Sequence, residues 1–209
     1  MTGAQAMKRA GLFLLAVLLM APLAAWADDF AELRRDAARI STISADFVQR
    51  KFMKILSRPL VSEGKFYFAK PDSIRWEYIK PVKSVAVSGK GVAKRYIVSE
   101  GKMVEDKTGG ARVMKIVLDE VAGWMSGRFD SNPSFAASLK EGTPTVITLT
   151  PVEKSMSGMI EKIEIIISRK DMTIKSVRII ESATAETRID FAHVVINKEI
   201  NPSVFRDVP

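Results

Sequence analysis

The chain has 209 residues, of which 47% are hydrophobic and 27% are charged, and its formal net charge at pH 7 is +8. It contains no cysteine and only one histidine, which excludes disulfides, thiol chemistry and metal sites built on clusters of these residues. The basic residues are spread in twos and threes and form no stripe of the kind that binds nucleic acid. Nucleic acid is therefore not an expected partner, whereas a mild attraction to anionic membrane headgroups fits this charge.

The N-terminus has the parts of a secretory signal peptide. A short basic start precedes an apolar run over residues 11–23, which is well below the roughly 20 residues needed to span a bilayer. Ala25-Trp26-Ala27 then supplies the small-x-small pattern that signal peptidase requires. We therefore expect residues 1–27 to be removed on export and residues 28–209 to form one domain.

The residues after this site predict one helix and then a series of strands. From Asp28 to about Ser41, apolar side chains recur every three or four residues, as in an amphipathic helix. From Ala45 to Phe52 the period changes towards two, which predicts a strand. Residues 63–81 hold two aromatic-rich strands around a Lys-Pro-Asp-Ser turn, the composition of a hairpin. Further short strands are predicted over residues 82–88, 95–98 and 103–106.

The middle of the chain interrupts the β pattern. Apolar side chains recur at helical spacing from Arg112 to Gly127, and Gly127 is expected to end this second helix. Strands are predicted again over residues 145–150, 160–168, 173–181 and 186–196. The pattern therefore predicts an α+β fold, in which a large antiparallel sheet curls towards a barrel. Two helices on its concave face would form a helical lid.

The sequence lacks the motifs of common enzymes. His193 is the only histidine, and neither a G-x-S-x-G elbow nor a phosphate-binding G-x-x-x-x-G-K-[ST] loop is present. Scattered carboxylates leave glycoside chemistry open as an alternative. We expect no catalytic residues, no metal and no cofactor, and therefore a binding protein rather than an enzyme.

Several short motifs, taken together and in order, resemble those of the LolA family of lipoprotein carriers. Residues 63–81 are similar to its E-G strand, basic-Pro turn and aromatic strand with a tryptophan and a second proline. Phe47-Val48-Gln49 resembles the family's F-x-Q, and Thr148-Leu149-Thr150-Pro151 its L-x-P strand end. The C-terminal T-x-x-x-F…N…F pattern is matched by Thr187, Phe191, Asn197, Asn201-Pro202 and Phe205.

The resemblance implies a periplasmic carrier with an unclosed β-barrel of antiparallel strands, covered by a helical lid, whose apolar interior accepts the acyl chains of lipoproteins. We expect the carrier to be a monomer. Such carriers receive cargo from an inner-membrane ABC transporter complex and pass it to an outer-membrane receptor. For this chain we also expect transient contact with the membrane surface, because of its basic charge. Lys70 matches a basic residue of the family, usually arginine, that bonds to backbone carbonyls of the lid and holds it shut. We call this predicted role the lid latch; a turn lysine in solvent is the alternative, since an ammonium group lacks the planar fork of arginine.

Strand alternation then predicts which side chains face the interior, if Lys70 faces inward as well. An ordinary solid core is the alternative for all of them. The expected lipid-binding residues are Phe66, Phe68, Ile74, Trp76, Tyr78, Val117, Val121, Trp124 and Met125.

The resemblance is weakest over residues 88–96, which are more basic and less apolar than the family's D-G-K-x-x-aromatic strand. This difference leaves open a LolA-like carrier of another lipid, such as a glycolipid. A non-transporting domain that senses envelope stress by binding envelope proteins is a further alternative.

Overall fold

The fold is that of a computed structural model, which describes residues 30–107, 109–153 and 157–208. The predicted signal peptide, residues 1–27, lies outside these described residues. Within them, no helix has both the length and the apolar character needed to cross a membrane.

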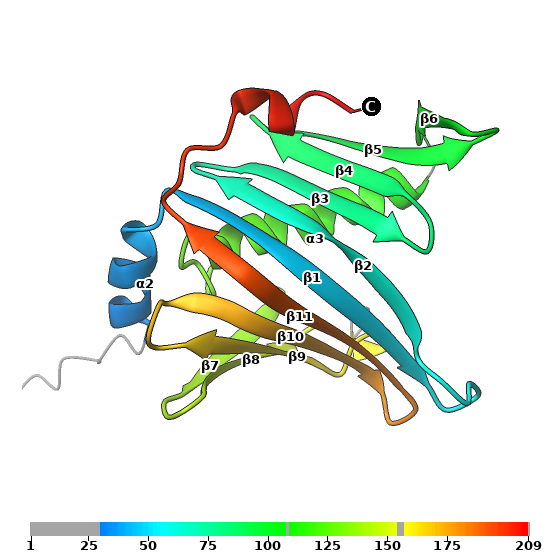
Figure 1. The fold of residues 1–209 in the computed structure, drawn as a ribbon. Coiled ribbons are helices and arrows are strands. Elements are labelled where there is room, and N and C mark those ends of the chain that lie inside the picture. The colour runs from blue at the N-terminus through cyan, green and yellow to red at the C-terminus, as the bar shows by residue number, and fades with distance from the viewer. Residues whose placement is uncertain (1–29, 108, 154–156, 209) are drawn as a thin grey trace, which may run out of the picture.

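An antiparallel sheet of eleven strands forms most of the described structure (Figure 1). Its order is β6-β5-β4-β3-β2-β1-β11-β10-β9-β8-β7, so the first and last strands of the chain pair in the middle of the sheet. Two meanders, one from each half of the chain, therefore share this centre. The strands are β1 (Thr42–Met53), β2 (Leu60–Ala69), β3 (Ser73–Lys80), β4 (Ser84–Gly89), β5 (Val92–Ser99), β6 (Lys102–Glu105), β7 (Phe135–Lys140), β8 (Thr145–Pro151), β9 (Lys162–Ser168), β10 (Thr173–Ser182) and β11 (Ala185–Ile196).

The sheet is curved but not closed, because its edge strands β6 and β7 pair on one side only. Helix α3 (Gly109–Met125) joins these two edges along the chain and crosses the inner side of the sheet (Figure 1). Helix α2 (Ala31–Ala38) and the short helix η1 (Pro202–Phe205) lie at the end where β1 begins. This architecture confirms the predicted unclosed barrel with a helix over its interior.

Two details differ from the sequence-based expectation. First, α3 alone crosses the concave face, whereas the eight-residue α2 covers one end of the sheet. Second, β7 was not predicted, although its residues alternate between half-buried and exposed. Alanine and serine have low β-propensity, and it is the pairing with β8 that makes this segment a strand.

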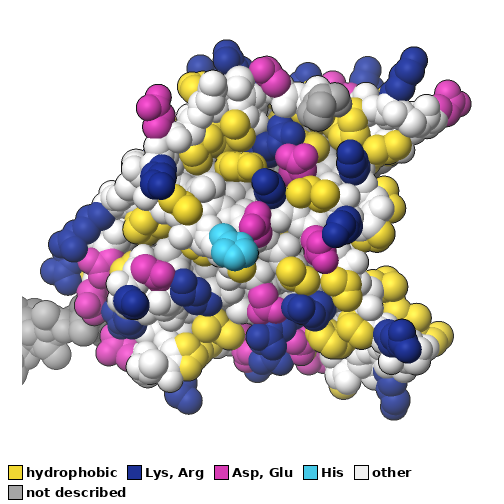
Figure 2. Space-filling model, viewed as in Figure 1, with side chains coloured by type: hydrophobic (Ala, Val, Ile, Leu, Met, Phe, Trp, Pro, Cys, Tyr) yellow, Lys and Arg dark blue, Asp and Glu magenta, His cyan; other side chains and the backbone are white. Residues whose placement is uncertain are grey.

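The outer face of the sheet carries charges of both signs, interspersed with hydrophobic side chains (Figure 2). Arg178 lies at the centre of one cross-strand group, where it bonds to Glu164 on β9 (2.7 Å) and to both carboxylate oxygens of Glu186 on β11 (2.9 and 3.0 Å). The single histidine, His193, lies on the same face and contacts Asp46 (2.9 Å). Such mixed charge is typical of a solvated surface.

Gly64 explains why the E-G motif needs a glycine. It lies opposite Phe47 in the pairing of β1 with β2. A Cβ atom at this position would come within 2.5 Å of the Phe47 ring and would also clash with the backbone oxygen of Glu77. The missing side chain therefore leaves room for the Phe47 ring, which contacts Trp76 and Tyr78.

Candidate functional site

A cavity of about 200 Å³ lies between α3 and the inner face of the sheet. Its walls are almost entirely apolar, and they come from α3, β1, β3, β10 and β11. The lining residues are Gln49, Trp76, Tyr78, Val117, Val121, Trp124, Met125, Val177, Ile179, Thr187, Ile189 and Phe191.

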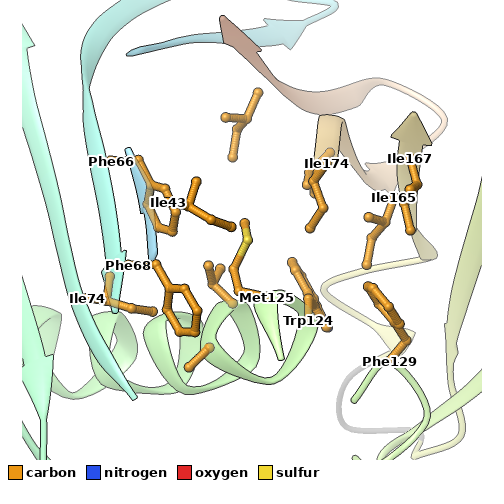
Figure 3. Packing of buried hydrophobic residues seen from close by; sticks show 14 of the residues in the cluster. Ile43, Phe66, Phe68, Ile74, Trp124, Met125, Phe129, Ile165, Ile167 and Ile174 are labelled. Atoms are coloured by element: carbon orange, nitrogen blue, oxygen red, sulfur yellow. The ribbon is translucent and has the colours of Figure 1, made fainter. Parts of the chain in front are cut away.

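The structure brings six of the nine predicted lipid-binding residues together around this cavity. Trp76 and Tyr78 reach it from β3, and the other four are those predicted on the helix. The remaining three, Phe66, Phe68 and Ile74, are fully buried nearer to α2 and do not line it. Figure 3 shows these three facing Met125 and Trp124, with Ile165, Ile167, Ile174 and Phe129 on the opposite side. The interior is thus densely packed at the α2 end and open farther along the sheet.

An aromatic cluster separates these two regions. The ring centroid of Trp76 lies 4.9 Å from that of Phe47, 5.5 Å from that of Phe66 and 6.2 Å from that of Phe191. Tilted and edge-to-face contacts at such distances stabilise aromatic pairs beyond simple burial. The cluster therefore gives the cavity one firm wall, which does not depend on α3.

Polar groups inside the cavity are few. The Tyr78 hydroxyl donates a hydrogen bond to Gln49 Oε1 (2.8 Å), and burial raises the pKa of Tyr78, so it stays protonated. The nearby indole N–H of Trp76 lowers the pKa of Tyr78, but by less than burial raises it. Trp76 Nε1 itself forms no hydrogen bond of ordinary geometry with a described residue. This wall suits an uncharged, apolar guest.

Sequence reasoning missed the opposite wall, formed by β10 and β11. The alternation of Thr187, Ile189 and Phe191 was visible in the sequence as one face of a strand. Their place became clear only from the pairing of β11 with β1, which sets Ile189 opposite Gln49 and Phe191 opposite Phe47.

The cavity reaches the surface at the end away from α2. Val117 lines it and is 43% exposed. At the same end, Thr187 donates to Glu181 (2.8 Å), and Glu181 forms an ion pair with Lys51 on β1. We call Val117, Lys51 and Glu181 the cavity mouth, where an apolar interior meets charged groups.

The cavity is small for a binding site. Binding sites for small molecules usually have volumes of roughly 300–1,000 Å³, and about 200 Å³ falls below that range. Two further spaces, at the α2 end, hold only about 10 and 20 Å³ each. A long alkyl chain would therefore enter only if α3 moved away from the sheet.

Lys70 contacts the end of α2 rather than α3. Its Nζ donates to the backbone oxygens of Ala37 (3.0 Å) and Ala38 (2.8 Å), which are the last two residues of that helix. A cation suits this place, because the C-terminal carbonyls of a helix lack partners and carry partial negative charge.

Helix α2 in turn touches the C-terminal end of α3. Gly127, the predicted end of α3, follows its last residue Met125 and has a φ of 78°, which favours glycine. A Cβ atom on Gly127 would lie 2.9 Å from Cβ of Ala37, so the two helices are in close contact here. Asn197 holds the other side of the α2 end, because its side chain accepts from Ser41 N (2.7 Å) and donates to Arg39 O (3.0 Å). Among the described residues, the side-chain hydrogen bonds of Lys70 therefore reach α2, and α2 lies between Lys70 and the end of α3.

No ligand set for a metal emerges from the described residues, since no three His, Cys, Asp or Glu side chains converge there. The site has the form of an apolar binding pocket under a helix, in a half-open sheet. That architecture defines a class of proteins that enclose apolar guests.

The family model described as outer membrane lipoprotein carrier protein LolA matches residues 38–207. The match spans most of the chain, and the protein belongs to the LolA family, as its motifs indicated. The family is one of carrier proteins. Comparison with curated proteins gave no significant match.

Solved structures share the fold at very low sequence identity. An uncharacterized conserved protein from Thermus thermophilus has a TM-score of 0.54 at 9% identity, over 85% of this chain and 93% of that one. A chain of the Pseudomonas aeruginosa MucA/MucB complex has a TM-score of 0.51 at 12% identity, over 86% of this chain and 60% of that one. A LolA superfamily protein from Nitrosomonas europaea has a TM-score of 0.42 at 7% identity, over 84% and 96%.

Proposed function

We propose that this protein is a periplasmic carrier that shields the acyl chains of lipoproteins and moves them from the inner to the outer membrane. The observation that carries the proposal is the apolar cavity between α3 and the sheet, in a member of a carrier family. The mature carrier would comprise residues 28–209. An inner-membrane ABC transporter complex would load it and an outer-membrane receptor would unload it.

A simple magnitude shows why the helix over the cavity should move. Burying one methylene contributes about 0.8 kcal/mol, so three acyl chains of roughly 15 methylenes correspond to about 36 kcal/mol. Non-covalent affinities do not exceed about 18–21 kcal/mol. The carrier therefore cannot retain the whole of this energy and still release its cargo. Exposure of part of the cavity to water, when α3 moves, would lower the affinity before transfer.

The test is to identify what the protein holds. We expect mass spectrometry of the protein purified from the periplasm to detect acylated peptides. Depletion of the protein should leave outer-membrane lipoproteins in the inner membrane. Normal sorting after depletion would refute the lipoprotein role.

Two other candidates remain distinguishable in the same experiment. A free glycolipid in place of acylated peptides would indicate a carrier of another lipid, which the basic segment at residues 88–96 favours. The fold shared with the MucA/MucB complex favours a domain that binds an envelope protein. In that case the protein would be purified free of lipid and would bind a protein partner instead.

A further inference from the structure

Large apolar side chains are exposed at one end of the sheet, around the turn between β1 and β2. We call residues 52–61 the β1–β2 tip. Ile55, at its outermost point, is 89% exposed. The other exposed apolar side chains of the tip are Phe52, Leu56, Leu60 and Val61.

The neighbouring strands present similar side chains at the same end of the sheet. Because adjacent strands are antiparallel, β3 and β8 end there and β9 begins there. Val82 and Val152 follow the ends of β3 and β8, Met159 precedes β9, and all three are exposed. The apolar surface is therefore not confined to one loop, and the tip is its outermost part.

The tip is also basic. Lys54 and Arg58 flank its apolar turn, and the sequence from Arg50 to Ser62 contains no acidic residue. Both side chains are exposed, and neither forms an ion pair with any residue that the structure describes. Figure 2 shows this mixture of hydrophobic and basic side chains at the lower right, where β1 and β2 meet in Figure 1.

Backbone contacts hold the tip in place. Lys54 N donates to Thr184 O (2.9 Å) in the turn between β10 and β11, and Leu56 N donates to Met53 O (2.9 Å). A surface groove of about 560 Å³ runs between the two hairpins, with Leu56 and Ile180 among its lining residues. The exposed apolar side chains thus belong to an ordered structure that is available for contact without folding on binding.

This combination fits one partner better than others. The cores of protein interfaces are depleted of charged residues. Here Lys54 and Arg58, which form no ion pair with a described residue, flank the exposed Ile55-Leu56 pair. Apolar side chains next to lysine and arginine are typical of elements that lie at the surface of an anionic bilayer. The cavity mouth is at the same end, because β1 runs from Gln49 through Lys51 to the tip.

We propose that the β1–β2 tip docks the protein on an anionic phospholipid bilayer. Ile55 and Leu56 enter the headgroup region, and Lys54 and Arg58 contact lipid phosphates. Docking brings the cavity mouth towards the membrane. The proposal concerns the outer surface alone and does not depend on which guest the cavity carries.

Vesicle flotation with the purified protein tests this directly. We expect the protein to bind vesicles of phosphatidylglycerol and phosphatidylethanolamine, and to bind them less in high salt or when phosphatidylcholine replaces both lipids. The double variant Ile55→Ser, Leu56→Ser should bind at least about tenfold more weakly, because burial of each side chain is lost. Lys54→Gln and Arg58→Gln should each reduce binding to the anionic vesicles about fivefold.

Val92→Ser is the matched control. Val92 is 60% exposed, but it is the first residue of β5, at the opposite end of the sheet. This variant should bind vesicles as the unmodified protein does. The proposal is wrong if the unmodified protein does not bind anionic vesicles at low salt, or if the double variant binds them equally well. In a further outcome, the unmodified protein would not bind vesicles but would sediment as a dimer, and the double variant would sediment as a monomer. That result would overturn the proposal and show that the tip joins two copies of the chain.

Discussion

Among single residues, Lys70 has the clearest link between a contact and a proposed step. Replacing it with leucine removes both hydrogen bonds to the α2 carbonyls. Because Lys70 is exposed and water can reach these carbonyls, losing the two bonds should cost about 0.5–1.5 kcal/mol in the free energy of unfolding. Since α2 touches the end of α3, we expect Lys70→Leu to retain cargo but to release it at a changed rate.

Transfer of a fluorescent acylated peptide from the protein to vesicles would measure this. Lys70→Arg is the control, because a guanidinium group can also donate to two carbonyls. Loading and release that are unchanged in Lys70→Leu would remove Lys70 from the mechanism.

Glu186 allows a prediction about pH. Hydrogen bonds from Arg178 lower the pKa of Glu186 below its ordinary value of 4.5. A carboxylate with a lowered pKa stabilises the fold above its unfolded pKa, and this contribution disappears as the pH falls through the folded pKa. Glu186→Gln should therefore lower the free energy of unfolding by about 0.5–1 kcal/mol at pH 7, since the pair is partly exposed. In urea unfolding, the difference from the unmodified protein should shrink below about pH 4.5; a constant difference would contradict this account.

Among the elements, α3 determines how much space the interior offers. Its buried side Leu118, Val121 and Trp124 packs towards the sheet, and Val121 lines the cavity. Val121→Phe should fill part of the cavity at little cost in stability, because the added atoms occupy empty space. Loss of room for two or three methylenes should weaken binding of a fluorescent fatty acid by roughly tenfold or more.

Val104→Phe is the corresponding control. Val104 lies on the edge strand β6, is partly exposed, and does not line the cavity. Its variant should bind the fatty acid normally. Equal binding by both variants would show that the ligand enters elsewhere.

In the molecule as a whole, the sheet and α3 should respond differently to cargo. The central strands β1 and β11 are each paired on both sides, whereas α3 contacts the sheet mainly through β3, β4 and β5. Amide hydrogen exchange should therefore become faster in α3 when an acylated peptide is loaded, and should stay slow in β1 and β11. An unchanged α3 in the loaded protein would contradict the proposed opening.

Much of this architecture could be read from local patterns. The change from helical to two-residue periodicity located α2, α3 and most strands, because side-chain direction repeats every 3.6 or 2 residues. The F-x-Q and E-G motifs correctly indicated the family, and they do so because the Phe47 ring needs the space above Gly64. Lys70 donates to helix carbonyls from the hairpin turn, but to those of α2, and its role as the lid latch stays a prediction.

The pairing of distant strands was decided only by the tertiary structure. Alternation shows which face of a strand a residue occupies, but not which strand lies beside it. The sequence therefore could not separate Phe66 and Phe68, in the solid core, from Trp76 and Tyr78, at the cavity. Nor could it show that β11 forms a cavity wall, or that Lys70 holds α2 rather than α3. Periodicity is a property of neighbouring residues, whereas a cavity is the space left between elements that meet from far apart in the chain.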